Sequence, residues 1–371
     1  MVEISTEPFA ATKSASSPVS CAISQPQEQS ESLDPLLDPA WDRLALSHPD
    51  AGFFHSSAWA KVLCKTYGHR PAYFQITRSS EPVALVPIME VKSRLTGCRG
   101  VSLPFTDFCI PLLFGGGGMN LVMEKLAAIA RERGWKHFEV RSGPAPHASA
   151  TPSATFFGHE LDLRHSAETL FAGFASSVRR AIRKAEKSGL NVQVTRTRDA
   201  VLAFYRLHIQ TRRKHGLPPQ PVSFFLNIYE EVIARDLGFI VLAKAGERPV
   251  AAAMYFRSGK KAVYKFGASA ETSQEARCNN LVMWAGIRHL VSCGVESLHF
   301  GRSAIGNAGL RRFKLGWGTK EETLQYFRFD PRGGTWLIDR DRTSGFHTAI
   351  FRRLPLALNR IAGTVIYPHL D

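Results

Sequence analysis

The segment from His299 to Lys320 reads HFGRSAIGNAGLRRFKLGWGTK and combines a strand pattern, a turn and a helix pattern. Alternating apolar residues predict a strand over 295–300, and NAGLRRFKLGW predicts a short helix over 307–317. Lys314 lies between Phe313 and a Gly-Trp-Gly turn, with other basic residues but no acidic residue within four positions. A solvated helix face usually mixes both signs of charge. The segment therefore predicts either a functional cation or a lysine whose stem is half-buried.

The excess positive charge lies in the second half of the chain. The net charge is +15; residues 1–160 carry 14 Lys/Arg and 15 Asp/Glu, whereas residues 161–371 carry 33 and 17. Such a surface suits anionic partners, namely nucleic acid, a phosphate-bearing cofactor or a membrane leaflet, although charge also serves solubility. We expect any anion-binding surface in the second half.

Length and composition indicate a globular protein of two or three domains. The 371 residues are 44% hydrophobic and 10% aromatic, which is enough apolar surface for a core. Six scattered cysteines without metal-ligand spacing predict reduced thiols, no metal site and a cytoplasmic protein. Residues 1–36 are expected to form a disordered leader without signal-peptide character. The longest apolar run is too short to cross a membrane, although peripheral membrane contact stays open.

The second half shows a regular succession of elements. Apolar spacing predicts helices over 169–190, 199–216 and 223–238, with a short strand over 191–196. Three apolar strands with glycine-containing turns follow over 239–269 and predict an antiparallel meander. The remaining predicted elements are a helix over 279–294, the strand and helix of the opening segment, and a final strand over 321–329.

The first half repeats part of this order. Strands and turns are expected over 72–103, a helix over 121–134 and a strand over 135–143. RERGWKHFEVRS and VSCGVESLHFGRS hold equivalent places, each with a helix end, a glycine, an alternating strand and Arg-Ser. We therefore predict two copies of one mixed α/β unit, 37–160 and 161–371, with a boundary in the turn-rich segment before residue 161.

Six segments of the second half occur in a recognisable order: SSVRRAIRKAEKSGL, TRRKHGLPPQPVSFF, YKFGAS, LVMWAGIRHLVSCG, HFGRS and FKLGWG. With them the chain, over roughly residues 40–370, resembles the FemAB-like branch of the GNAT acyltransferases, including members associated with exopolysaccharide gene clusters. The resemblance implies a mixed α/β fold of two tandem GNAT-like units with a cleft between or along them. It also implies transfer of an acyl or aminoacyl group to an amine or hydroxyl of a cell-wall or polysaccharide precursor. Peptidoglycan-bridge members take the aminoacyl group from charged tRNA.

The resemblance also points to the reacting centre, because the family places there the Phe-Lys pair before the aromatic-Gly segment, here Phe313 and Lys314. Acyl transfer passes through an oxyanion, and a fixed cation aimed at it contributes on the order of 3 kcal/mol. We expect Lys314 to be catalytic, shielded from water by Phe313 and Trp317. Asp107, an acid within the apolar PFTDFCIP, is a candidate general base or else a turn residue. The two can act together only if the halves face each other.

Other residues are candidates for substrate contact. Arg212, Arg213 and Lys214 end a helix, where they either complement its dipole or clamp a phosphate or carboxylate. Gly301 permits close backbone approach to a ligand at a strand end. The other candidates for substrate contact are Tyr264, which could equally be core, Arg302 and Ser303, which could equally form a strand-exit turn, and Phe313 and Trp317.

A basic stripe on the predicted helix 169–190 is the candidate donor site. Arg180, Arg183, Lys184 and Lys187 recur at three- and four-residue spacing and suit phosphate contacts, or else form an exposed helix face. The glycine run at 114–118 lacks the Lys-Ser/Thr of a phosphate-binding loop and is expected to be a flexible loop.

Two alternatives to an aminoacyl-tRNA-dependent enzyme stay open. A CoA-dependent N- or O-acyltransferase is the first, although neither RFKLGWG nor RERGWK fits the usual pyrophosphate loop of acetyl-CoA enzymes. A non-catalytic nucleic-acid or membrane-surface binder is the second, because interleaved aromatic residues can stack on bases. No tightly bound cofactor is expected, and aminoacyl-tRNA or acyl-CoA would be a co-substrate.

Overall fold

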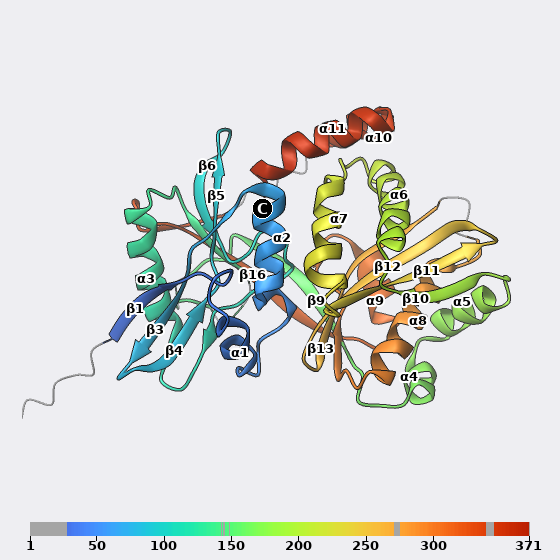
Figure 1. Ribbon diagram of the computed structural model, residues 1–371, viewed down its shortest axis with the longest axis horizontal. Helices are drawn as coiled ribbons and strands as arrows, with labels where there is room; N and C mark the ends of the chain where they lie inside the picture. Colours follow the sequence, from blue (N-terminus) through green and yellow to red (C-terminus); the bar gives the residue numbers. More distant parts are fainter. Residues whose placement is uncertain are drawn as a thin grey trace, which may run out of the picture.

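The computed structural model describes residues 28–141, 143, 145–147, 149–270, 275–338 and 345–370. Within them, one mixed sheet of 13 strands runs through both halves, and a second sheet of 4 strands belongs to the first half. Figure 1 shows the first half at the left and the second at the right, with β9 (Ala154–Asp162) and β16 (Lys320–Asp330) between them. The predicted mixed α/β architecture is confirmed.

The order of strands follows from the pairing registers. The small sheet runs β1 (Glu28–Leu33), β3 (Tyr73–Arg78), β4 (Glu81–Val86) and β7 (Leu112–Leu113). The large sheet runs β10 (Asn191–Thr195), β11 (Gly238–Ala245), β12 (Arg248–Ser258), β13 (Lys261–Ser269), β14 (Ser297–His299), β9, β16, β8 (Phe138–Arg141), β6 (Gly97–Val101), β5 (Met89–Ser93) and β2 (Arg70–Pro71). Two short strands extend it, β15 (Ser303–Ala304) beside β9 and β17 (Thr335–Leu337) beside β16.

Two strands cross between the halves. β9 ends the first half in sequence but pairs antiparallel with β14 of the second, whereas β16 of the second half pairs antiparallel with β8 of the first. β9 and β16 also pair with each other, from Lys320 opposite Glu160 to Tyr326 opposite Ala154. The expected boundary after residue 160 falls within β9, and β9 and β16 each pair with a strand of the other half.

Each half contains one short parallel pair at an equivalent place in the sheet. β13 pairs with β14 from Lys261–Ser297 to Val263–His299, and β6 pairs with β8 in the first half. β13 then continues to Ser269 while β14 ends at His299. The two strands part at this point, and the polar cluster described below fills the opening.

Helices cover both faces of the meander formed by β11, β12 and β13. Alternate strand residues point to opposite faces of the sheet. On one face, Ile240 and Met254 form a core with α6 (Arg198–Lys214) and α7 (Val222–Ile228). On the other face, Val241 and Tyr255 form a core with α8 (Cys278–Ser292). The first core also takes Phe53, Trp59 and Phe54 from the first half, so the halves share it. The other helical segments are α1 (Trp41–Leu46), η1 (Phe53–His55), α2 (Ser57–Tyr67), α3 (Met119–Glu132), α4 (Ala167–Gly173), α5 (Ser176–Glu186), η2 (Tyr229–Ile233), α9 (Ala308–Leu315), α10 (Gly345–Arg353), α11 (Leu356–Ile366) and η4 (Tyr367–His369).

Most predicted elements of the second half are present, with two differences there and a third in the expected leader of the first half. The helix expected over 169–190 is split into α4 and α5, because Phe174 is extended and the Ala175 N–H donates to the Gly316 carbonyl. Part of the expected leader forms β1, which pairs with β3, while residues 1–27 lie outside the described residues. The helix expected over 223–238 forms α7 and then widens to a π-helix in η2. In the described part of the chain, none of the helices is long and apolar enough to cross a membrane.

Candidate active site

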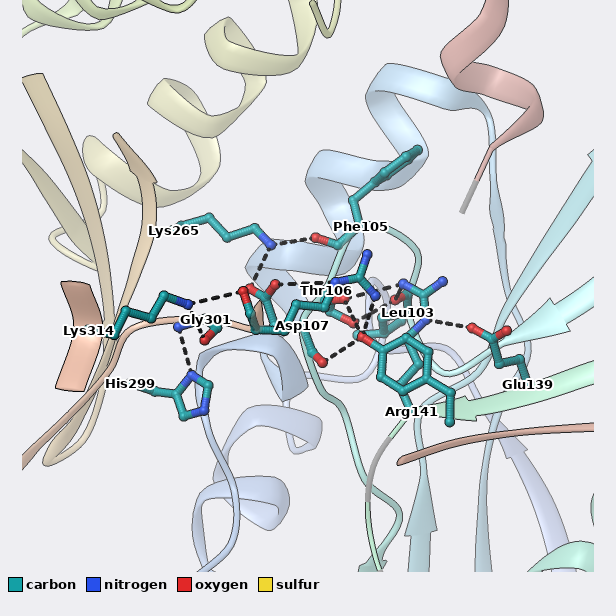
Figure 2. A network of polar contacts seen from close by, with 12 residues as sticks. Leu103, Phe105, Thr106, Asp107, Glu139, Arg141, Lys265, His299, Gly301 and Lys314 are labelled. Carbon is teal, nitrogen blue, oxygen red and sulfur yellow. Dashed lines mark hydrogen bonds and ion pairs between the residues drawn. The ribbon is translucent and has the colours of Figure 1, made fainter. Parts of the chain in front are cut away.

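A cluster of charged side chains lies between the two halves, where β13 and β14 part (Figure 2). It consists of Asp107 from the loop after β6, Lys265 on β13, Arg302 after β14 and Lys314 on α9, and we call it the central cluster. The two residues named from the sequence as catalytic, Asp107 and Lys314, thus come from opposite halves and enter one site. The condition that the halves face each other is met.

The loop that carries Asp107 has a constrained backbone. Leu103 and Phe105 both have φ of 60°, a left-handed conformation that costs a side-chain-bearing residue about 1–3 kcal/mol and is typical of functional sites. Arg141 holds this loop by donating to the carbonyls of Leu103 and Thr106 at 3.3 Å each. Surrounding contacts therefore determine where the Asp107 carboxylate lies.

The exchanged strand β16 adds to this support. Tyr326 Oη donates to the Asp107 carbonyl at 2.7 Å, and Arg328 Nη2 lies 2.6 Å from Glu139 Oε2. Glu139 in turn accepts from Arg141 Nε at 2.8 Å. The position of an acid from the first half is thus fixed in part by a strand from the second.

Asp107 is an ionised counter-ion. Its carboxylate lies 3.2 Å from Lys265 Nζ and 3.9 Å from Arg302 Nε. Burial raises the pKa of Asp107, but the charges of Lys265 and Arg302 outweigh burial and bring the pKa to about 2. A carboxylate with such a pKa is a weak proton acceptor at neutral pH. The geometry favours a role in holding cations over the general-base role expected from the sequence.

A β-bulge aims Lys265 at this carboxylate. Tyr255 pairs with Tyr264 and Met254 with Phe266, so Lys265 is the extra residue of β13. Its Nζ also donates to the Phe105 carbonyl at 2.6 Å, and burial lowers its pKa. The bulge turns a lysine from the sheet into the space between the halves.

Lys314 is almost fully buried on α9, which begins at the side-chain cap of Asn307. Its Nζ donates to the carbonyls of Gly301 at 2.7 Å and Arg302 at 3.0 Å. Burial lowers the pKa of Lys314 to about 8, although the negative charge of Asp107 raises it in part. At pH 7 an ammonium with this pKa is about 90% protonated. Lys314 is therefore a positioned cation, and within the described residues no carboxylate forms an ion pair with it.

Gly301 makes this arrangement possible. Its φ of 72° lies in the region that glycine adopts without strain. A Cβ at this position would lie 3.3 Å from Asp107 Oδ2. The close neighbour of Gly301 is thus a side chain of the other half, and the predicted approach of Gly301 to a ligand stays a prediction.

Two adjoining hollows form one basic groove beside α9. The first, of about 530 Å³, is lined among others by Arg180, Lys184, Arg277 and Arg312. The second, of about 510 Å³, is lined among others by Lys214, Tyr264, Gly267, Arg277 and Phe313. Both include Asn280 near the start of α8, where backbone N–H groups favour anions. The groove thus brings residues of α5, α6, α8 and α9 around a space suited to phosphate groups.

Arg277 is a groove residue that the sequence analysis missed. It is the N-cap of α8 with φ of 55°, an uncommon conformation for a side-chain-bearing residue. Helical periodicity carries no signal for a single left-handed residue. The one available hint was its position directly before a strongly apolar helix.

A separate cavity is lined by residues of both halves. This cavity, of about 310 Å³, has apolar walls that include Phe53 and Phe108 and carries the polar residues Asp50, Glu160, Lys261, His299 and Glu322. We call it the His299 cavity. His299 Nδ1 accepts from the Gly301 N–H at 2.9 Å, so in the neutral ring Nε2 carries the proton and donates to Glu322 Oε1 at 3.1 Å. His299 thus connects the cavity wall to the backbone that holds Lys314.

The structure places four residues predicted for substrate contact in structural roles. Trp317 is fully buried among Phe174, Phe300 and Phe313, so it is a core residue, and this prediction is corrected. Ser303 is buried in β15 opposite Phe157. Arg212 donates to the Pro218 carbonyl and Tyr367 Oη, and Arg213 to the Arg352 carbonyl, so both hold the C-terminal segment.

The remaining candidates divide between the groove and its surroundings. Lys214, Tyr264 and Phe313 line the basic groove, and Arg302 belongs to the central cluster. Of the predicted donor stripe, Arg180 and Lys184 line the groove. Arg183 instead stacks on the Phe171 ring at 5.5 Å, and Lys187 is an exposed C-cap of α5. A single helix face therefore does not bring all four cations to one ligand.

Comparisons with known proteins agree with this geometry. Residues 172–321 match the acetyltransferase (GNAT) domain family. The structure of FemX is similar with a TM-score of 0.62 and 13% identity, over 80% of this chain and 96% of that one. A tandem GNAT protein from the clavulanic acid biosynthesis pathway is similar with a TM-score of 0.53 and 10% identity, over 82% and 99%. None of the curated proteins matches this chain.

The chain therefore carries a GNAT domain, the domain of an acyltransferase. Its two halves share their fold with FemX and with the tandem GNAT protein, and the predicted fold of tandem GNAT-like units is confirmed.

Proposed function

We propose that this protein is a FemAB-like acyltransferase that moves an acyl or aminoacyl group from an activated, phosphate-bearing donor to an amine or hydroxyl. The acceptor is a precursor of the cell envelope or of an exopolysaccharide. The observation that carries the proposal is the buried ammonium of Lys314, held by the carbonyls of Gly301 and Arg302. Lys314 follows Phe313 of the basic groove, and Gly301 is hydrogen-bonded to His299 of the His299 cavity.

Lys314 stabilises the oxyanion of the transfer step. An ammonium has three N–H donors, and within the described residues the Gly301 and Arg302 carbonyls take two of them. The third is left for the carbonyl oxygen of the donor, whose negative charge develops as the nucleophile attacks. One such donor contributes about 3 kcal/mol to lowering the barrier in a water-excluded site.

The chemistry needs no group beyond the two substrates. The acceptor nitrogen or oxygen forms a bond to the acyl carbon, the carbonyl bond re-forms, and the bond to the departing oxygen or sulfur breaks. The proton of the nucleophile leaves with the departing group. Asp107 fixes Lys265 and Arg302 and raises the pKa of Lys314, so it acts as a positioning residue.

The basic groove and the His299 cavity suit the donor and the acceptor, respectively. The basic groove offers Arg180, Lys184, Arg277 and Arg312 to the phosphates of the donor. The His299 cavity offers carboxylates within apolar walls, which suits an acceptor that carries an amino group. Phe313 borders the basic groove and Phe108 the His299 cavity, and each is adjacent in sequence to a residue of the central cluster.

Aminoacyl-tRNA is the donor that we favour, because the groove is open, strongly basic and extended over several helices. Acyl-CoA is the second candidate, favoured by the acetyltransferase domain match and by the position of the groove beside β13 and the start of α8.

Turnover and affinity measured with both donors decide between them. The purified protein is assayed with an aminoacyl-tRNA pool, with uncharged tRNA, with acetyl-CoA and with longer acyl-CoAs, at two salt concentrations and with the Lys314→Met variant. Preference for charged over uncharged tRNA supports the aminoacyl donor, and micromolar CoA binding with turnover replaces it by CoA. Equal, salt-sensitive binding of any RNA without turnover, unchanged in Lys314→Met, overturns the enzyme proposal in favour of a basic binding protein.

A further inference from the structure

Helix α11 exposes its apolar side to solvent, whereas a normal surface helix buries it. It buries Asn359 and Gly363, whereas Leu358, Ile361 and Val365 are 51%, 60% and 60% exposed. The exposed three recur at helical spacing and form one apolar face. A surface helix of a globular protein normally turns its apolar side to the core. The exposed apolar face of α11 is therefore suited to bind an apolar surface outside the chain.

The inward side of α11 is fixed closely to the second half. A Cβ at Gly363 would lie 1.9 Å from the Pro219 carbonyl oxygen, so only glycine permits this contact. Asn359 is fully buried, and the Tyr367 hydroxyl that follows α11 donates to the Pro218 carbonyl at 3.2 Å. The helix is therefore fixed with its apolar face outward, and it cannot turn that face inward without losing these contacts.

The apolar face continues over the neighbouring segments and is flanked by arginines. Ile350 on α10 is 44% exposed, and Leu356 and Leu370 are 37% and 41% exposed. Arg352 and Arg353 are exposed beside them, and residues 345–370 contain no Asp or Glu. Figure 1 shows α10 and α11 along one edge of the molecule, spanning from α2 to α6. We call the exposed residues of 349–370 the interfacial face.

We propose that the interfacial face binds the surface of an anionic phospholipid bilayer. Leu, Ile and Val side chains enter the boundary between headgroups and acyl chains, and Arg352 and Arg353 contact lipid phosphates. The face lies flat on the membrane and does not cross it, because α11 spans only Leu356–Ile366. This proposal does not rest on the transfer chemistry of the active site.

The charges favour a bilayer over a second copy of the chain. A two-fold symmetric dimer through this face would bring the arginines of one copy close to those of the other, with no acid in 345–370 to compensate. An anionic lipid surface complements both the apolar residues and the cations. It also places the basic groove near the bilayer, because α10 and α11 contact α6, whose last residue Lys214 lines that groove.

Vesicle co-sedimentation of the full chain tests the proposal. The probes are vesicles of phosphatidylcholine alone and of phosphatidylcholine with about one third phosphatidylglycerol, a fraction in the range where polybasic surfaces bind. The test variant is Leu358→Ser/Ile361→Ser/Val365→Ser, whose residues are exposed. The matched control is Leu37→Ser/Leu46→Ser/Leu95→Ser, three residues of the first half that are 81%, 52% and 77% exposed.

We expect the wild type and the control to bind the anionic vesicles and the test variant to lose binding at least about tenfold. Arg352→Gln/Arg353→Gln should weaken binding and reduce its dependence on phosphatidylglycerol. Absence of wild-type binding overturns the proposal, and so does equal binding by the test variant. A concentration-dependent dimer that the test variant abolishes, without vesicle binding, assigns the face to a second copy instead. Turnover in vesicle-free solution reports on the active site separately.

Discussion

Replacing Lys314 with methionine removes the charge at the centre of the site while keeping most of the side-chain volume. The variant loses one oxyanion donor, which corresponds to about 3 kcal/mol, or a fall of about 10²–10³ in kcat. It also leaves the carbonyls of Gly301 and Arg302 without their donor, at about 1–3 kcal/mol of unfolding free energy for each buried group. Activity and stability should therefore both fall, and they must be measured separately.

The assay is single-turnover acyl transfer at saturating donor, with urea unfolding of the same preparations. Lys260→Met is the matched control, because Lys260 is exposed and pairs with Glu296 on the surface. A folded Lys314→Met that keeps kcat within about threefold of the wild type would refute the oxyanion role, since one lost donor typically costs far more.

The pH profile gives an independent check on the same residue. Burial lowers the pKa of Lys314 to about 8, and the proposed role needs the protonated form. The rate of the wild type should therefore decline as pH rises through about 8, and Lys314→Met should lack this declining limb. A wild-type rate that stays constant up to pH 10 would contradict the assignment.

Three further predictions concern the surroundings of Lys314. Gly301→Ala should lower the free energy of unfolding by about 1–2 kcal/mol, because φ is positive at this position. It should also reduce kcat, because the new Cβ contacts Asp107. Gly246→Ala, also at positive φ but in open space, should lower the free energy of unfolding without changing kcat. Asp107→Asn should destabilise the fold by about 3 kcal/mol at pH 7, because a buried lysine loses its counter-ion. Because the charges of Lys265 and Arg302 lower the pKa of Asp107 to about 2 in the folded state, this difference should be constant above about pH 5 and shrink as pH falls toward 2. Urea titrations across this range measure it, and a constant difference would contradict the ion pair. Arg180→Gln/Lys184→Gln should raise the KM for the donor about tenfold and lower its salt dependence with kcat unchanged, and an unaltered KM would exclude the groove as donor site.

Much of the second half was predictable from local signals. The meander and α8 follow from apolar periodicity and from glycines at turns, because these elements fold by burying one face each. Asp107 and Lys314 were also identifiable singly, one as an acid among apolar residues and the other as a lysine without nearby acids. Their meeting in one cluster depended on the arrangement of the halves, which local patterns do not encode.

The features that escaped prediction depend on long-range contacts or on single backbone conformations. β9 and β16 have ordinary strand patterns, and a strand pattern does not state which half supplies its neighbour. The bulge at Lys265 and the left-handed conformation of Arg277 each depend on a single residue. A periodic pattern of apolar residues cannot indicate the conformation of one residue. Trp317 was misread because a buried aromatic and a ligand-stacking aromatic carry the same sequence signal beside a glycine.

The exchange of β9 and β16 also determines when the central cluster can assemble. During synthesis the first half can collapse early, but β8 gains its second neighbouring strand, β16, only about 190 residues later. Tyr326 and Arg328, which hold the Asp107 loop, arrive with that same strand. A nascent chain cut before β16 therefore lacks the charge arrangement that the proposed transfer requires. Activity in this fold is a property of the closed chain, and neither half expressed alone should acquire it.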